Sequence, residues 1–312
     1  MSVEPSRNLV LVHSEGWQDV ADFHAIKLRV EAIAPDIEVF VVSNDIRSSV
    51  TRKRAAERPT LVFSPIRLMA FSPVRGKVYA GQHMSKLIEM RRLADAGLPV
   101  PRFEAIRPET KLSEAEFGRY VVVKPSYELA SWGQGVELFR TADVRYRPPE
   151  DYPADHPGRR GPMVAQTFID CGKAMTCRVL TFFGETIFTY CRQSTRPLAL
   201  DPAQPVYTQS DFMPSPPERV SYIARDADML ALAARAYRAM PEAALQACDI
   251  LRDVKGGLHL LEINPGGGTW MLSSPLAAGY RAALEIDDLA APFDAFAVIA
   301  RALVARTRAE AE

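Results

Sequence analysis

Oxygen-bearing side chains are concentrated where the stretch LLEINPGGG, residues 260–268, changes from an apolar run to proline and glycine. Residues two apart in a strand share a face, so Glu262 and Asn264 converge. Asp249 lies on the preceding strand of a predicted hairpin and joins them if it points to the same face. Hard oxygen ligands in an open arrangement suit Mg²⁺, with Mn²⁺ as the alternative ion. A solvated sheet face is the competing interpretation, but the neighbours of Glu262 are apolar and favour metal ligation.

Two lysines have the sequence context of phosphate ligands. Lys124 ends the apolar run YVVV and precedes a proline, which places a point charge at the mouth of a buried strand. An edge lysine that extends its amine into solvent fits the same pattern. Lys86 lies in the first turn of a predicted helix, where the helix dipole favours acids. A nearby anion would remove that conflict.

Arg178 and Arg192 lie within apolar strand segments and therefore need a carboxylate or a phosphate partner. A structural ion pair and an anion-binding role both remain open for them. The loop ASWGQGV contains Trp132 and Gly133, and the backbone N–H groups of such a loop can fold over phosphates. Ordinary hairpin loops contain glycine as well.

The first 70 residues alternate strand and helix patterns. We predict strands over residues 8–13, 37–42 and 60–64 and a helix over 20–34, a β-α-β arrangement with a parallel sheet. The turn after the first strand has a single glycine instead of G-x-G-x-x-G, which argues against a dinucleotide-dependent oxidoreductase.

The remaining sequence predicts an antiparallel, strand-rich region with a few helices. A helix follows Ser85 and ends at Gly97, and proline-rich loops interrupt the strands. The expected strands are 120–126, 135–139, 163–169, 175–183 and 186–194, followed by a hairpin with its turn at 255–257; the expected helices are 227–240 and 287–308; the expected loops are 140–162 and 198–219.

Composition limits the class of protein. The 312 residues are 47% hydrophobic, and 38 basic side chains balance 38 acidic ones. This balance argues against nucleic acid or a membrane surface as the main partner, because both require a basic excess. No apolar run approaches the roughly 20 residues of a membrane span, and the N-terminus does not resemble a signal peptide. We therefore expect a cytoplasmic protein whose four cysteines are core thiols and not catalytic or zinc-binding groups.

The order of these motifs resembles the ATP-grasp superfamily, which includes D-alanine–D-alanine ligase and glutathione synthetase. The resemblance rests on a lysine before AGLPVP, VVVKPS with a glycine loop, VAQTFI, CRVLTFFGE and D…E-x-N-P-G-G-G-T. It covers residue 84 to the C-terminus. The implied fold class is α/β, with a Rossmann-like β-α-β domain over 1–83 and an ATP-grasp domain over 84–312. The small lobe of that domain would span about 112–168.

The resemblance also implies roles for individual residues. Lys86 and Lys124 would contact ATP phosphates, and Trp132 and Gly133 would cover them. Arg178 and Arg192 would neutralise the γ-phosphate and a tetrahedral intermediate, and Gly267 would face an acyl phosphate. The expected Mg²⁺ ligands are Asp249, Glu262 and Asn264, and the expected adenine-binding residues are Gln166, Thr167, Phe168 and Ile169.

By resemblance, the expected activity is ATP-dependent ligation. A carboxylate would become an acyl phosphate and react with an amine or a thiol, with release of ADP and phosphate. The expected partners are small carboxylic acids and amines, either amino acids or peptides, and a homodimer is a habit of the family. A non-catalytic ATP-binding regulatory protein and a small-molecule kinase on the same scaffold are the alternatives.

Overall fold

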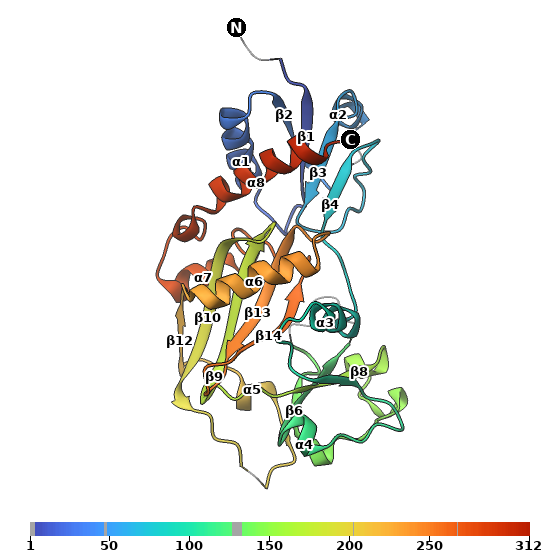
Figure 1. Ribbon diagram of the computed structural model, residues 1–312, viewed down its shortest axis with the longest axis vertical. Coiled ribbons are helices and arrows are strands. Elements are labelled where there is room, and N and C mark those ends of the chain that lie inside the picture. The colour runs from blue at the N-terminus through green and yellow to red at the C-terminus, as the bar shows by residue number, and fades with distance from the viewer. Residues whose placement is uncertain (1–3, 47–48, 127–132, 202, 267) are drawn as a thin grey trace.

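The computed structural model describes residues 4–46, 49–126, 133–201, 203–266 and 268–312. Within them the strands form three sheets, which follow one another along the long axis of the molecule (Figure 1). The N-terminal sheet lies at one end, a large antiparallel sheet in the middle, and a smaller antiparallel sheet at the other end.

The N-terminal sheet is parallel, as predicted, with the order β2-β1-β3-β4. Its apolar strands are covered on both faces, which explains their nearly continuous hydrophobic runs. Asp19 caps the first helix by accepting a hydrogen bond from the Ala21 N–H. The elements are β1 (Arg7–His13), α1 (Val20–Ile33), β2 (Ile37–Ser43), α2 (Ser49–Ala55), β3 (Thr60–Ser64) and β4 (Lys77–Ala80).

The C-terminal helix α8 (Ala295–Glu310) returns to this first sheet. It packs against α1, β1 and β3, and its buried residues Ile299 and Leu303 belong to the same core as Leu9 and Phe23. The sequence predicted this helix over 287–308. It begins later, at Ala295, because a 3₁₀ turn that contains Pro292 precedes it. The division of the chain after residue 83 stays a prediction, and α8 shares its core with residues from before that point.

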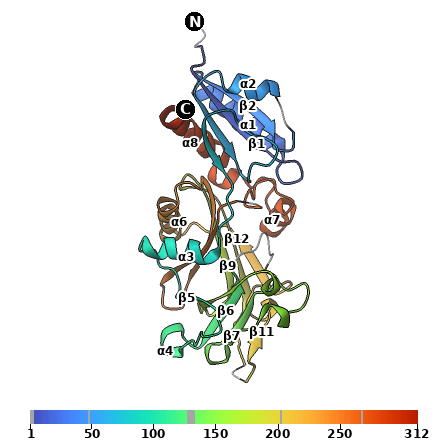
Figure 2. The same cartoon turned by 90° about the vertical axis from the view of Figure 1, so that its right-hand side faces the viewer.

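The large sheet is antiparallel, with the order β12-β10-β9-β13-β14. Figure 2 shows α3 and α6 on one side of it and α7 on the other. The elements are α3 (Lys86–Asp95), β9 (Lys173–Phe182), β10 (Glu185–Pro197), β12 (Arg219–Tyr222), α6 (Ala227–Ala239), β13 (Leu245–Arg252), β14 (Leu258–Asn264) and α7 (Ala277–Leu284).

The small sheet has the order β11-β7-β6-β8-β5 and draws on distant parts of the chain. The segment 198–219, expected to be a loop, contributes β11 and α5, so it returns from the large sheet to the edge of the small one. The elements are β5 (Phe103–Ala105), α4 (Glu114–Phe117), β6 (Tyr120–Pro125), β7 (Glu137–Arg140), β8 (Met163–Thr167), β11 (Val206–Tyr207) and α5 (Gln209–Phe212).

The cysteines differ from the expected set of four core thiols. Cys177 and Cys191 lie opposite each other in the register of β9 and β10, and their sulfur atoms are in contact. Cys248 is a buried free thiol, and Cys171 is a half-buried one. None of the described helices is both long enough and apolar enough to cross a membrane.

Candidate active site

Two lysines from different parts of the fold meet on one carboxylate oxygen. Lys86, the first residue of α3, and Lys124, near the end of β6, each place Nζ 2.8 Å from Oε2 of Glu262 on β14. The three side chains are 18%, 8% and 17% exposed. Burial opposes ionisation of Glu262, but the attraction of Lys124 and Lys86 is stronger and leaves its pKa well below the usual range. The small sheet and the large sheet are therefore joined at this carboxylate.

A β-bulge turns Glu262 towards the lysines. In the register of β13 and β14, Asp249 pairs with Glu262 and Ile250 pairs with Leu260, so Leu261 is the extra residue. Leu260 and Ile263 are both buried in the core beneath α6. Without the bulge, Glu262 would share the face of Leu260, because side chains two apart in a regular strand point the same way.

Asp249 lies beside Glu262 and is held by an arginine. Both carboxylate oxygens of Asp249 accept hydrogen bonds from Arg178, each at 2.7 Å. Burial disfavours the charged form of Arg178, but the attraction and hydrogen bonds of Asp249 are stronger and raise the pKa of the guanidinium. Asn264 places Nδ2 3.4 Å from Oδ2 of Asp249. The structure thus brings the three predicted metal ligands together on one face.

The chemistry of these three side chains fits Mg²⁺. Two carboxylates and one amide supply hard oxygen ligands and leave room for water or phosphate oxygens. Among the described residues, no three or more His, Cys, Asp or Glu side chains gather into a metal-binding group. The candidate set contains only two acids, and its third member is the amide of Asn264.

Arg192 extends the positive charge along the same face. Its Nε donates to Oγ1 of Thr176 at 3.2 Å, and its guanidinium carbon lies 5.7 Å from the ring centroid of Tyr190. Tyr190 pairs with Arg178 in the strand register and approaches Tyr280 of α7, with ring centroids 4.6 Å apart. Within the described residues, no carboxylate lies in ion-pair distance of Arg192.

The predicted adenine-binding residues lie where β8 leaves the small sheet. Gln166 is 3% exposed, and its Nε2 donates to the carbonyl oxygen of Leu261 at 3.0 Å, so this side chain contacts β14. Thr167 has a buried hydroxyl that finds no hydrogen-bond partner among the described residues. The ring of Phe168 lies 6.3 Å from that of Phe212, and Ile169 is buried.

The predicted glycine positions are only partly described. Gly133 adopts a φ of +83°, and a Cβ there would overlap the side chain of Gln209. At Gly266, a Cβ would lie 2.8 Å from the backbone nitrogen of Gln82, so the close approach of two backbones requires glycine. Trp132 and Gly267 lie outside the described residues.

Sequence reasoning missed Glu89 on α3. This side chain is 2% exposed, and one of its oxygens accepts a hydrogen bond from the Ile263 N–H at 2.6 Å. Burial raises the pKa of Glu89 to about 8, against the opposing attraction of Lys86. The available signal was its spacing: Glu89 follows Lys86 by three residues and precedes the buried Leu93 by four, which places it on the inner helical face.

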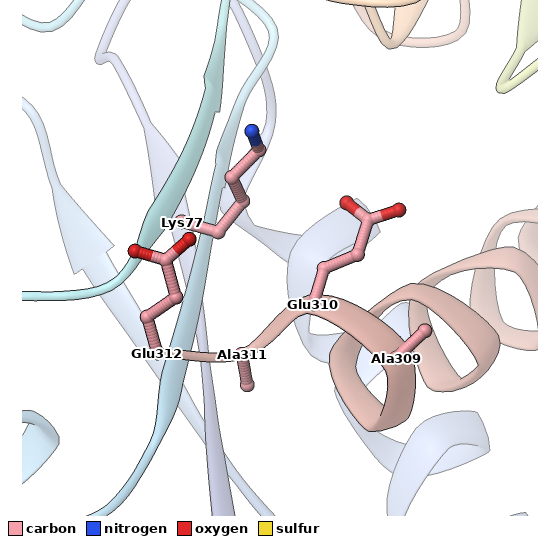
Figure 3. A pocket seen from close by; sticks show the side chains of 5 residues that line it. All are labelled: Lys77, Ala309, Glu310, Ala311 and Glu312. Carbon is pink, nitrogen blue, oxygen red and sulfur yellow. The ribbon is translucent and has the colours of Figure 1, made fainter.

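A surface hollow of about 330 Å³ lies elsewhere, at the C-terminal end of α8 (Figure 3). It is lined by Lys77, Ala309, Glu310, Ala311 and Glu312. Lys86, Lys124 and Glu262 do not line this hollow, so it is separate from the candidate site.

Comparison with solved structures identifies the fold. No family model and no curated protein sequence matches the chain. The structure is similar to D-cycloserine synthetase DcsG, with a TM-score of 0.54 and 15% identity over 96% of this chain and 99% of that one. It is also similar to the ATP-grasp ligase PsnB complexed with a minimal precursor, with a TM-score of 0.51 and 17% identity over 97% and 100%.

A third similar structure is the macrocyclase MdnC from Microcystis aeruginosa MRC, bound with precursor peptide MdnA. The TM-score is 0.51, with 16% identity over 95% of this chain and 99% of that one. These likenesses show that the chain has the ATP-grasp fold, which confirms the predicted fold class.

Proposed function

We propose that this protein is an ATP-dependent ligase that activates a carboxylate as an acyl phosphate and joins it to an amine. The observation that carries the proposal is the convergence of Lys86 and Lys124 on Glu262. Two lysines that are only 18% and 8% exposed share one carboxylate, which leaves an excess of positive charge in a poorly solvated place. A polyphosphate can take over the lysines, while the carboxylate becomes available to a metal ion.

The charge balance of the whole face supports a polyanionic ligand. Lys86 and Lys124 pair with Glu262, and Arg178 pairs with Asp249. Arg192 adds a fourth cationic side chain on the same face of the sheet. Burial favours the neutral form of the nearby Glu89. Unbalanced positive charge in a poorly solvated site is costly, and bound phosphate groups would relieve that cost.

The residue types match the demands of phosphoryl transfer, which depends mainly on positioning and charge neutralisation. Glu262, Asp249 and Asn264 would hold Mg²⁺, which supplies additional neutralisation of phosphate charge when bound. Lys86 and Lys124 would hold phosphate oxygens in place. An oxygen of the substrate acid attacks the γ-phosphorus, ADP leaves, and the acid is now an acyl phosphate.

The second half of the proposed reaction is an aminolysis. The amine nitrogen attacks the acyl carbon, a tetrahedral oxyanion forms, and phosphate leaves as the amide bond is made. Arg178 can stabilise that oxyanion because it lies on the same face as the acids and remains charged. No protein nucleophile is required, which agrees with a site made of cations, acids and an amide.

The substrates that we propose are an amino acid or peptide carboxylate and an amine. Among the similar structures, one is a D-cycloserine synthetase, one holds a minimal precursor and one holds a precursor peptide. In this chain Arg192, Tyr190 and Tyr280 flank Arg178 and provide one cation and two aromatic rings for substrate contact.

Trapping the activated acid tests this function. The protein would be incubated with ATP, Mg²⁺, hydroxylamine and pools of amino acids, small acids or peptides, because hydroxylamine converts an acyl phosphate to a hydroxamate. We expect ATP-dependent hydroxamate with the wild type and none with Glu262→Gln. ATP binding without hydroxamate would favour the regulatory alternative, and a stable phosphorylated product would favour the kinase.

A further inference from the structure

The outer edge of β14 is capped by residues from outside its own sheet. β14 is an edge strand, so its outward N–H and C=O groups need partners. The Leu260 N–H donates to the carbonyl of Pro99 at 2.9 Å. The Leu261 carbonyl accepts from Gln166 Nε2 at 3.0 Å. The strand that carries Glu262 is therefore held by residues from two separate segments of the chain.

The next group along this edge has a different kind of partner. The Ile263 N–H donates to an oxygen of the Glu89 carboxyl group at 2.6 Å. Ile263 is 1% exposed and Glu89 is 2% exposed, so water is not available as a substitute. Ile263 also separates Glu262 from Asn264, which places this hydrogen bond between two of the proposed metal ligands.

The position of Glu89 on α3 gives it a role that Lys86 cannot fill. Both residues tie the first turn of α3 to β14, Lys86 through the Glu262 side chain and Glu89 through the Ile263 backbone. If Lys86 moves to a phosphate, its bond to Glu262 is lost. The Glu89 bond to the backbone can persist, so the strand keeps its place while the Glu262 side chain changes partner.

We propose that Glu89 is a positioning residue that holds the β14 backbone between Glu262 and Asn264 and thereby aims these two side chains at the metal ion. This inference rests on the proposed function, because it assumes that these two side chains bind Mg²⁺. Groups that orient metal ligands from behind affect metal affinity by about 10- to 100-fold when they are removed.

Three substitutions separate the hydrogen bond from the charge. Glu89→Gln keeps an acceptor at the same reach and removes the acid. Glu89→Asp keeps the acid and withdraws the acceptor by one methylene. Glu89→Met fills the space without an oxygen. Arg92→Ala is the matched control, because it breaks the contact of α3 with Glu242, between α6 and β13, and leaves the hydrogen bond of Glu89 to the Ile263 backbone in place.

The first readout is the affinity for Mn²⁺ in the presence of a non-hydrolysable ATP analogue, followed by the electron paramagnetic resonance signal of free Mn²⁺. We expect Glu89→Gln to bind as the wild type does, and Glu89→Asp and Glu89→Met to bind about 10- to 100-fold more weakly. The second readout is hydrogen exchange of the Ile263 amide, which should accelerate in Glu89→Asp and Glu89→Met only. Arg92→Ala should lower stability and leave both readouts unchanged.

The outcomes distinguish the positioning role of Glu89 from the ligase function. Wild-type Mn²⁺ affinity in Glu89→Asp and Glu89→Met would overturn the positioning role and leave the ligase proposal intact. Equal losses in Glu89→Gln and Glu89→Asp would also overturn it, because the hydrogen bond would not be the relevant interaction. If the wild type itself binds no Mn²⁺ with the nucleotide analogue, the proposed function fails and the role of Glu89 fails with it. Should Glu89→Met not fold, Glu89→Gln and Glu89→Asp decide the question.

Discussion

Leu260 and Glu262 are two positions apart on β14 and point to opposite faces of the large sheet. Leu260 is completely buried beneath α6, whereas Glu262 contacts Lys86 and Lys124 on the other side. The bulge at Leu261 makes this arrangement possible, because it adds one residue to the strand without a partner on β13. The site thus depends on a local irregularity of the sheet as much as on the identity of its acids.

The first prediction concerns the stability of the protein without ligands. Glu262→Gln removes the anion that Lys86 and Lys124 share, and the Lys124 side chain is only 8% exposed. Breaking a buried ion pair from one side costs roughly 3–5 kcal/mol, so we expect the free energy of unfolding to fall by about 3 kcal/mol. Urea unfolding measures this change, with the exposed Glu104→Gln as control. An unfolding midpoint equal to that of the wild type would contradict the inferred role of the pair.

The second prediction concerns nucleotide affinity. Lys124→Met should weaken ATP binding about 10- to 100-fold, because a hydrogen bond between charged groups contributes about 1.5–3 kcal/mol. Lys111→Met, at an exposed position outside the site, should bind ATP as the wild type does. Calorimetric titration with ATP and Mg²⁺ provides the measurement. Equal affinities for the two variants would remove Lys124 from the site.

The third prediction concerns the contact of Asp22, on α1, with Trp270. An oxygen of Asp22 accepts a hydrogen bond from Trp270 Nε1 at 2.8 Å. Burial raises the pKa of Asp22 above its ordinary 3.8, against the lowering effect of hydrogen bonds from Ser273 and Trp270. The folded state therefore binds the proton more tightly than the unfolded state does. The resulting stabilisation is complete below pH 3.8 and is lost as the pH rises through the folded pKa.

Asp22→Asn removes this titration and can still accept the Trp270 hydrogen bond. We expect the wild type to lose stability relative to Asp22→Asn as the pH rises from about 3.8. Urea unfolding of both proteins at a series of pH values from about 3.8 upwards isolates the contribution of Asp22, because all other titrating groups are common to the two proteins. A difference in unfolding free energy that grows in favour of the wild type with rising pH would show that the pKa of Asp22 is lowered.

Much of the fold could be predicted from the sequence because its elements have strong local signals. The apolar runs of β1, β2 and β3 and the helical spacing in α1 predicted a parallel β-α-β arrangement, and the structure confirms it. The hairpin of β13 and β14 was also predicted, with its turn at residues 255–257. The sequence order of the motifs indicated ATP-grasp, and the comparisons confirm that fold.

The features that were missed depend on contacts between distant segments. A bulge at Leu261 has no signature in a run of apolar residues, because the register with β13 decides it. Glu89 belongs to a helix whose acids are expected in solvent, and only tertiary packing places it against Ile263. The pairing of Cys177 with Cys191 likewise follows from the β9–β10 register.

The most direct test of the proposed ligase function is ADP release with ATP, Mg²⁺ and pools of carboxylic acids, each with and without added amines. Glu262→Gln serves as the control for contaminating ATPases. The proposal predicts ADP in the wild type that depends on an acid and an amine together, accompanied by a product that contains both. Release of ADP with an acid alone and a stable phosphorylated acid would contradict ligation, as would tight ATP binding without any ADP.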